Sequence, residues 1–284
     1  MNNYFFKREK VVELLDYIKK EFVSDKSLIE RAFNMDYEDW EFDMDFNILL
    51  DQIENIKKQK YLPVFSKEKV VDGLGKIALV CNQNPYLIFN FVLSCIYTNN
   101  KVEVVLGNKM LATNKIILEV LKKVLDEQKV EFGTVSYIEL SNQDDIISKQ
   151  DNYDLIYYFG NKNSYINFVK RLHIDSRFEE CGIINLYSDS KDFKETLVEI
   201  DKWAYLNEIK INFYNKDIEE AIKEINKYNS LGKMTIIISK DFDKITKFIR
   251  EVKTENIYVN TNPVSKYKYE TDLNNLVYTK NINW

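Results

Sequence analysis

GKIALVCNQNPYLIFNFVLSCIYTNNKVEVVLGNK, residues 75–109, is the stretch that decides the fold. A short apolar run, 77–81, leads into a polar turn and then into 86–97, a segment that is apolar on nearly every side. A second apolar run, 102–106, is followed by Gly107. This order predicts a strand–helix–strand crossover whose two loops open at the same sheet edge, where open α/β sheets hold ligands.

Strands and helices alternate beyond this stretch. One predicted helix, 114–128, carries its apolar residues on one face and has Thr113 as its N-cap. The strands 76–81 and 153–159 are apolar on both faces, as parallel strands covered by helices must be. Right-handed crossovers would then give a doubly wound parallel sheet of the α/β class. The strands predicted in this part of the chain are 76–81, 102–106, 133–139, 153–159 and 182–187.

The flanking segments complete the predicted domain organisation. Residues 1–60 carry apolar stripes at helical spacing. Beyond residue 188 the alternation continues, with Asp217 and Asp241 as acidic helix caps and a strand at 276–279. A lone strand of this kind often pairs with a neighbour or with another subunit. The predicted domains are a helical N-terminal segment, 1–60, a cofactor-type α/β domain, 61–187, and a reduced catalytic-type α/β lobe with the C-terminal strand, 188–284.

Residues 36–45 are both acidic and aromatic, which raises the question of a calcium loop. The segment has no glycine at the turn and no spaced closing glutamate, so it does not match an EF-hand. A solvated acidic connection with aromatic anchors is therefore the favoured interpretation.

The composition bounds the function classes. Of the 284 residues, 45% are hydrophobic and 30% are charged, which is ordinary for a soluble globular protein. The net charge of −5 argues against a general nucleic-acid binder. No apolar run is long enough for a membrane span, and residues 1–7 lack the apolar core of a signal peptide. Three cysteines without C-x-x-C spacing argue against a disulfide framework or a zinc site and favour a reducing cytoplasm.

Few side chains suit a nucleophile or a base. Cys95 lies inside the apolar helix 86–97 and is assigned to packing. Cys81 ends the first strand beside a helix start, but no partner base is identifiable, and a small buried hydrophobe explains it equally well. His173, at the end of a helix, is interpreted as a cap or a partly packed side chain. Only carboxylates remain as metal ligands, so no metal site is expected.

The order of these elements resembles the aldehyde dehydrogenase superfamily, and most of all its gamma-glutamyl phosphate reductase branch. Residues 75–85 are similar to the first cofactor-domain strand of that branch, and 104–114 to its next strand, glycine turn and helix start. Residues 153–160 resemble its Asp-Leu-Ile strand, and 217–260 its late catalytic-domain pattern. The order of all these blocks, over about residues 60–265, carries the resemblance.

The resemblance implies a Rossmann-like domain that binds NAD(P), and a homodimer. The chain has neither a G-x-G-x-x-G nor a Walker loop, but the family it resembles does not need that fingerprint. The contacts implied for the nucleotide are also ordinary turn residues. They are Asn84 after the first strand, Gly107, Asn108 and Lys109 after the second, and Gly160, Asn161 and Lys162 after the fourth.

The chain departs from the family pattern at the nucleophile. The reductase branch carries its catalytic cysteine in a loop that reads Gly-Ile-Cys-His, and here Gly182-Ile183-Ile184-Asn185 stands in its place. Cys181, three residues before Ile184, would have to supply the thiol. The chain also looks too short for a complete catalytic domain.

Two functions follow from these matches and departures. The first is an aldehyde dehydrogenase-like pseudoenzyme without the normal catalytic cysteine. Any residual activity would be NAD(P)-linked oxidoreduction of an aldehyde or an activated acyl group through a thiohemiacetal. The alternative is a non-catalytic binding or assembly protein on the same fold, with the old cleft filled by aromatic and isoleucine side chains.

Overall fold

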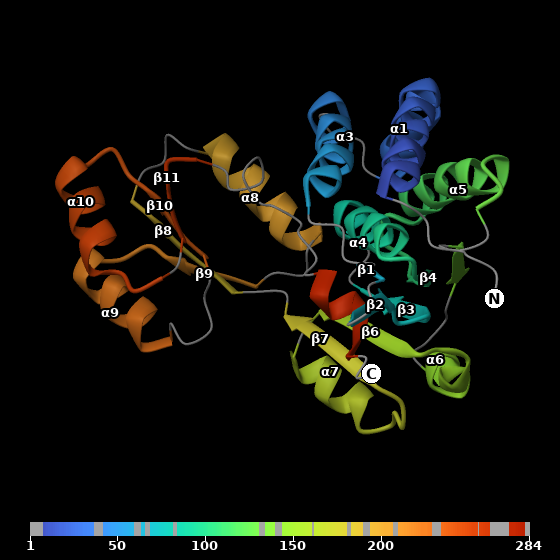
Figure 1. Ribbon diagram of the computed structural model, residues 1–284. Coiled ribbons are helices and arrows are strands. Elements are labelled where there is room, and N and C mark those ends of the chain that lie inside the picture. Colours follow the sequence, from blue (N-terminus) through green and yellow to red (C-terminus); the bar gives the residue numbers. More distant parts are fainter. Residues whose placement is uncertain are drawn as a thin grey trace. The chain divides into compact units, whose positions relative to one another are not determined.

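The computed structural model divides the chain into two compact units, Met1–Glu179 with Tyr269–Trp284, and Glu180–Lys268. Each unit holds one parallel sheet with its own helices (Figure 1). The residues that the structure describes are 8–36, 42–59, 64–65, 69–81, 84–130, 134–139, 144–160, 162–180, 183–189, 194–206, 210–228, 234–254, 256–261 and 273–281.

The first unit is built on a five-stranded sheet in the order β5-β4-β3-β6-β7. β3 pairs in parallel with β4 and with β6, and β4 pairs in parallel with β5. The doubly wound parallel sheet predicted from the sequence is therefore confirmed. The strands are β3 (Lys76–Val80), β4 (Lys101–Leu106), β5 (Val135–Glu139), β6 (Leu155–Gly160) and β7 (Ser176–Glu180).

Helices cover both faces of this sheet because its strands are apolar on both sides. On one face α4 packs directly on the strands, and the ring centroids of Phe91 and Tyr157 lie 4.7 Å apart. On the other face Ile146 and Phe168, from α6 and α7, pack against Tyr158 of β6. The helices are α4 (Pro85–Tyr97), α5 (Leu111–Glu127), α6 (Asp144–Ser148) and α7 (Lys162–Val169), with a 3-10 turn, η1 (Gln150–Asn152), before β6.

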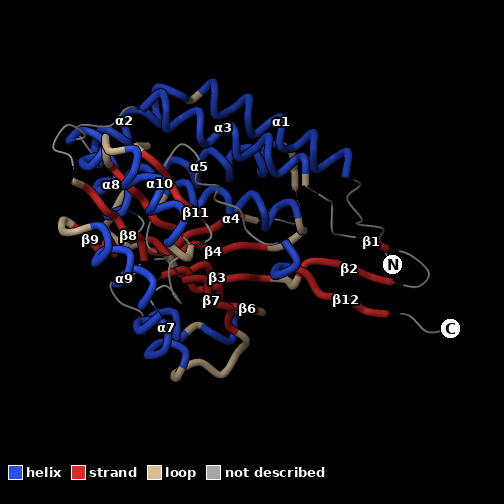
Figure 2. The backbone as a smooth tube through the Cα atoms, turned by 90° about the vertical axis from the view of Figure 1, so that its left-hand side faces the viewer, coloured by secondary structure: helices blue, strands red, loops and turns tan. Residues whose placement is uncertain are grey.

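Three N-terminal helices form an outer layer over α4 and α5 (Figures 1 and 2). Every residue of α4 is buried because this layer covers the side that the sheet leaves open. The rings of Phe22 and Phe89 are 4.8 Å apart, and Tyr97 Oη donates a hydrogen bond of 2.9 Å to Gln59 O. The three helices are α1 (Arg8–Ser24), α2 (Lys26–Asp36) and α3 (Phe42–Lys58).

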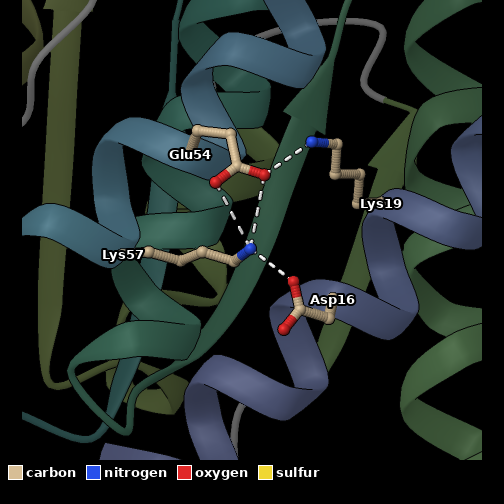
Figure 3. A network of polar contacts seen from close by, with 4 residues as sticks. All are labelled: Asp16, Lys19, Glu54 and Lys57. Carbon is tan, nitrogen blue, oxygen red and sulfur yellow. Dashed lines mark hydrogen bonds and ion pairs between the residues drawn. The ribbon is translucent and has the colours of Figure 1, made fainter.

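A chain of charges joins α1 to α3 (Figure 3). Lys57 of α3 pairs with Asp16 of α1 and, at 3.3 Å, with Glu54 on its own helix. Glu54 in turn accepts from Lys19 of α1 at 2.6 Å. Hydrogen bonds from Lys19 and Lys57 lower the pKa of Glu54 despite its partial burial. The network therefore joins the two helices through side chains that are only partly buried.

A small three-stranded sheet completes the first unit, in the order β1-β2-β12. β2 (Lys69–Gly73) pairs antiparallel with β1 (Val64–Phe65) and with β12 (Val277–Asn281), which a 3-10 turn, η4 (Leu273–Leu276), precedes. Figure 2 shows β2 and β12 running side by side. Asn100 ties this sheet to the larger one, because its Oδ1 accepts from Gly75 N at 2.9 Å and its Nδ2 donates to Leu276 O at 2.8 Å.

The second unit is a four-stranded, all-parallel sheet in the order β11-β10-β8-β9. α9 and α10 pack on one face, around Tyr187 and Ile237, and α8 packs on the other, around Ile184 and Ile236. The elements are β8 (Ile183–Ser188), α8 (Lys194–Leu206), β9 (Lys210–Tyr214), α9 (Ile218–Tyr228), β10 (Met234–Ile238), α10 (Phe242–Glu251) and β11 (Asn256–Val259).

The division between the units differs from the predicted domain boundaries. The strand predicted at 182–187, β8, opens the second sheet instead of closing the first. The strand predicted at 276–279, β12, returns to the first unit instead of ending the second. The N-terminal helices also belong to the first unit, because their apolar stripes pack on α4 and α5. Periodicity predicts that a strand exists, but it does not say which sheet the strand joins.

Among the described residues, no helix is both long and apolar enough to cross a membrane. The described part of the chain also contains no group of three or more His, Cys, Asp and Glu side chains that could hold a metal ion. Of the acidic segment 36–45, residues 37–41 lie outside the described residues. Its aromatic anchoring is confirmed at Phe42, which is buried with its ring centroid 5.5 Å from that of Phe33.

Candidate functional site

The winding of the first sheet reverses between β3 and β6. From β3 the chain passes through α4 to β4 and through α5 to β5, and it then returns to the other side of β3 as β6. In open α/β sheets, ligands bind beyond the carboxyl ends of the strands at such a switch point. Three helices begin at this carboxyl edge: α4 after β3, α5 after β4 and α7 after β6. Their starts form the candidate site.

The start of α4 is capped by a buried side chain, that of Asn84. Asn84 is fully buried, and its Oδ1 accepts a hydrogen bond of 2.9 Å from Leu87 N. Pro85 takes the first helical position, where it has no N–H to offer. Asn84 was predicted to contact a nucleotide, and the structure gives its side chain a capping role. A phosphate at α4 would thus find fewer backbone donors than at an open helix start.

The start of α5 is capped by a residue from another helix. Met110, at the N-cap position, has a φ of 49° and makes no side-chain hydrogen bond to the helix. Asp36, the last residue of α2, accepts instead from Ala112 N at 3.3 Å and from Thr113 N at 2.8 Å. The prediction that Thr113 is the N-cap is wrong, since α5 begins at Leu111. Asp36 was interpreted as part of a solvated acidic connection, but it ends α2 and caps the start of α5.

Gly107, Asn108 and Lys109 connect β4 directly to the turn before α5. The Asn108 side chain is exposed, whereas Gly107 and Lys109 are half-buried. The structure therefore brings these three predicted contacts to the same edge as the Asp36 carboxylate. The fold alone accounts for that placement, because the carboxyl ends of parallel strands meet at one edge.

The turn after β6 is the third part of the edge. Gly160 ends the strand, and a Cβ built on it would lie 3.0 Å from an atom of the Tyr158 ring, so the position favours glycine. Asn161 lies outside the described residues, and Lys162 begins α7. Gly160 and Lys162 thus lie next to the carboxyl end of β3, across the switch point from Gly107 and Lys109.

The described thiols are placed differently from one another. Cys95 is completely buried in α4, and burial raises the pKa of its thiol, which makes it a packing residue as predicted. Cys81 follows β3 at the carboxyl edge and is half-buried. Cys181, the residue predicted to supply a catalytic thiol, lies outside the described residues. It precedes β8 in the sequence by two positions.

His173 lies in the connection after α7 and does not cap or pack against the helix. Its imidazole is exposed, and its Nε2 lies 2.5 Å from Asp151 Oδ1. Its backbone N–H donates to the side chain of Gln150 at 2.9 Å. These partners come from the turn before β6, at the amino end of that strand. The imidazole is therefore on the opposite edge of the sheet from the candidate site.

The second sheet has its own switch point between β8 and β10, and a cluster of hydrogen-bonded polar side chains lies at the carboxyl ends of these strands. Asp189, after β8, pairs with Lys244 of α10 at 2.6 Å. Burial alone would raise the pKa of Asp189, but hydrogen bonds from Lys244 and Ser239 outweigh it and lower the pKa. Asn260 links the next strand by accepting from Ser239 N at 2.9 Å. Asp241 caps α10 by accepting from the N–H groups of Asp243 and Lys244, as predicted.

Ile184 does not occupy a loop. It lies inside β8, is 2% exposed and pairs with Met234 of β10. The strand predicted at 182–187 is thus confirmed as β8, and the match of Gly182-Ile183-Ile184-Asn185 to the family's catalytic loop stays a prediction. Asp189, which directly follows β8, is the described residue at the carboxyl end of this strand.

Three residues of these two edges were missed by sequence reasoning. Asp36 had no local signal, because its partners lie 76 and 77 positions away in the sequence. Asp189 could have been found by applying the switch-point rule to the second sheet, since it directly follows the first strand of that sheet. Lys244 could have been found only together with Asp189, because a lysine in a first helical turn is unremarkable.

No family model matches the chain. The chain is 22% identical over 256 residues to the gamma-glutamyl phosphate reductase of Thermodesulfovibrio yellowstonii, a match that covers 66% of this chain and 60% of that protein. Its fold is similar to that of gamma-glutamyl phosphate reductase from Thermotoga maritima, with a TM-score of 0.60, 14% identity, and coverage of 98% of this chain and 94% of that one.

A third similar protein is the glyceraldehyde-3-phosphate dehydrogenase GapN of Methanocaldococcus jannaschii, whose structure was solved in complex with NADP. The TM-score is 0.67 at 11% identity, with coverage of 98% of this chain and 90% of that one. The chain spans about 60% of the length of the curated relatives it matches. It is similar in sequence to gamma-glutamyl phosphate reductases and has the fold of the aldehyde dehydrogenase superfamily.

Proposed function

We propose that this chain is an aldehyde dehydrogenase-like protein that binds a nicotinamide dinucleotide at the carboxyl edge of the first sheet and lacks the normal thiol nucleophile of that family. The observation that carries the proposal is the switch point between β3 and β6, which gathers three helix starts and two glycine turns at one edge. Similarity to reductases and to an NADP-bound dehydrogenase supports it.

The chemistry of this edge fits a dinucleotide. The Asp36 carboxylate at α5 is an acceptor suited to ribose hydroxyls. The start of α7, with Gly160 and Lys162, is the place for the phosphates, because α4 and α5 are capped by the chain's own side chains. Gly107, Asn108 and Lys109 would line the ribose side, and Asn84 would shape the turn between the two.

A bound dinucleotide would supply or accept a hydride, and the chain's own residues would have to hold the substrate as a thiohemiacetal. Cys95 is excluded from that role by burial. Cys181 is the remaining candidate in the second half of the chain. No cysteine follows β8, β9, β10 or β11 in the sequence, where the carboxyl edge of the second sheet would present one. Binding without turnover of aldehydes is therefore the expected behaviour.

Titration of the pure protein with NADH and NADPH, followed by nicotinamide fluorescence, tests the binding. A saturable change is expected for at least one dinucleotide, and no change at millimolar concentration would refute the proposal. Oxidation of the dinucleotide with aldehyde or acyl phosphate substrates tests the chemistry. If wild type turns over and Cys181→Ser retains all of that activity, the proposed role of Cys181 is wrong.

A non-catalytic binding or assembly protein is the second candidate, and a feature of the second unit favours it. A groove of about 420 Å³ lies between α8 and β9 and is lined mainly by apolar side chains. Val198 is 46% exposed there and Phe213 54%, and exposed apolar side chains gathered in this way are typical of interaction surfaces. The homodimer implied by the family resemblance belongs to this proposal, and sedimentation equilibrium of the pure protein tests it.

A further inference from the structure

We infer that Asp36 makes the dinucleotide site prefer NAD(H) to NADP(H). The inference rests on the proposed function and concerns the ribose that carries the 2′-phosphate in NADP(H). Its starting point is the carboxylate of Asp36, which receives the N–H groups of Ala112 and Thr113 at the start of α5. Those N–H groups and the positive end of the helix dipole are what an anion binds at a helix start.

The position of this carboxylate follows from the topology. α5 begins after β4, the second strand of the doubly wound sheet, on the side of β3 away from β6. In dinucleotide-binding folds of this winding, the carboxyl end of the second strand meets the adenosine ribose, and an acidic residue there hydrogen-bonds to the 2′-hydroxyl. Here the segment after β4 reads Gly107-Asn108-Lys109 and contains no acid. Asp36 supplies the carboxylate from α2 instead.

A second observation marks the same turn of α5 as a polar site. Thr113 is fully buried, and its Oγ1 has no hydrogen-bond partner among the residues that the structure describes. Buried hydroxyls are nearly always satisfied in folded proteins, and those that are not are typical of places where water or a ligand completes the contact. The first turn of α5 therefore combines a bound carboxylate with an unmet polar group.

The nearby lysine does not reverse the preference. Lys109 precedes α5 and could pair with a phosphate through its ammonium group. A 2′-phosphate would also need donors at the helix start, and Asp36 already uses the N–H groups of Ala112 and Thr113. A ribose hydroxyl, in contrast, can donate to Asp36 without displacing it, since each carboxylate oxygen accepts more than one hydrogen bond.

Isothermal titration calorimetry with NADH and NADPH tests the inference. Wild type is expected to bind NADH at least about tenfold more tightly than NADPH, a factor equivalent to about 1.4 kcal/mol. Asp36→Asn keeps an acceptor for the helix start but removes the charge, so its ratio is expected to fall to about threefold or less through tighter NADPH binding. Asp151→Asn is the matched control, because it removes one charge at the opposite edge and should leave the ratio unchanged.

The outcomes separate the inference from the proposed function. Binding of both dinucleotides with equal affinity, or a preference for NADPH, overturns the inference alone. An unchanged ratio in Asp36→Asn does the same. Absence of binding by wild type overturns the proposed function and the inference with it. Unfolding of each variant without ligand is measured in parallel, and if Asp36→Asn does not fold, the wild-type ratio decides.

Discussion

Glu54, in the outer helical layer, makes the free energy of unfolding depend on pH. Glu54 accepts from Lys19 and from Lys57, and these hydrogen bonds lower its pKa below the usual range. A carboxyl whose pKa is depressed in the folded state stabilises the protein above its unfolded pKa of about 4.3. That contribution is lost as the pH falls through the folded pKa. The charge network between α1 and α3 therefore stabilises the folded protein at neutral pH and loses this effect in acid.

Glu54→Gln is expected to destabilise the protein by up to about 1 kcal/mol at pH 7, since the pair is partly exposed and screened by solvent. The difference from wild type should shrink progressively below about pH 5. Urea unfolding at several pH values measures it. Glu13→Gln, on the exposed side of α1, is the control, because it removes one carboxylate outside this network. A constant difference down to pH 4 would contradict the assigned role of the Glu54 charge.

Gly75 cannot be replaced without strain. Its φ is 124°, which side chains rarely tolerate, and an added Cβ would lie 2.2 Å from Asp154 Oδ2. Asp154 is held in place because it accepts from Lys76 N at 2.7 Å. Gly75→Ala should cost about 2–4 kcal/mol in unfolding free energy. Gly160→Ala lacks the positive φ and only adds a methyl group close to the Tyr158 ring, so it should cost about 1 kcal/mol, and equal losses in the two variants would refute the conformational argument.

At the scale of elements, α5 depends on a helix that precedes it by a long stretch of chain. Asp36→Ala removes the acceptor for two backbone donors of its first turn, and loss of an N-cap costs about 1 kcal/mol. The amides of Ala112 and Thr113 should then exchange faster with deuterium, while those in the middle of α5 change little. Hydrogen exchange followed by NMR measures both. Unchanged exchange at Ala112 and Thr113 would show that the cap contributes nothing.

The sequence predicted elements well where the signal is local. β3 and β6 were found because apolar runs bounded by turns are read directly from the chain, and Asp217 caps α9 as predicted, accepting from Glu219 N at 2.8 Å. Thr113 failed as a cap because the real acceptor comes from α2. β7 was missed because Ser176–Glu180 is largely polar, as an edge strand can be.

The candidate site was predicted to a similar extent. The switch point and the turns at Gly107 and Gly160 follow from strand order, so the predicted contacts do gather at one edge. The Asp36 carboxylate could not be predicted, because a contact between residues far apart in sequence leaves no pattern in either segment. Ile184 lies in a strand that its apolar run did predict, but which sheet that strand joins could not be read from the sequence.

At the scale of the whole molecule, each unit has its own hydrophobic core. A substitution in one core is therefore expected to destabilise mainly the unit that contains it. Ile225 is fully buried in the core of the second unit, and Leu121 is fully buried in the first. Ile225→Ala should cost about 2–4 kcal/mol and accelerate hydrogen exchange in α9 and β10 while leaving β3 and α4 protected. Leu121→Ala should do the reverse. Equal acceleration in both units after either change would mean that they unfold as one.

The return of β12 to β2 sets the order of events during synthesis. Asp72 pairs with Tyr278, and the whole second unit is translated between them. At ribosomal rates of about 5–20 residues per second, one edge of β2 waits roughly 10–40 s for its partner strand. Over that interval the nascent chain displays unpaired backbone groups, the kind of surface that chaperones cover and that neighbouring nascent chains can capture.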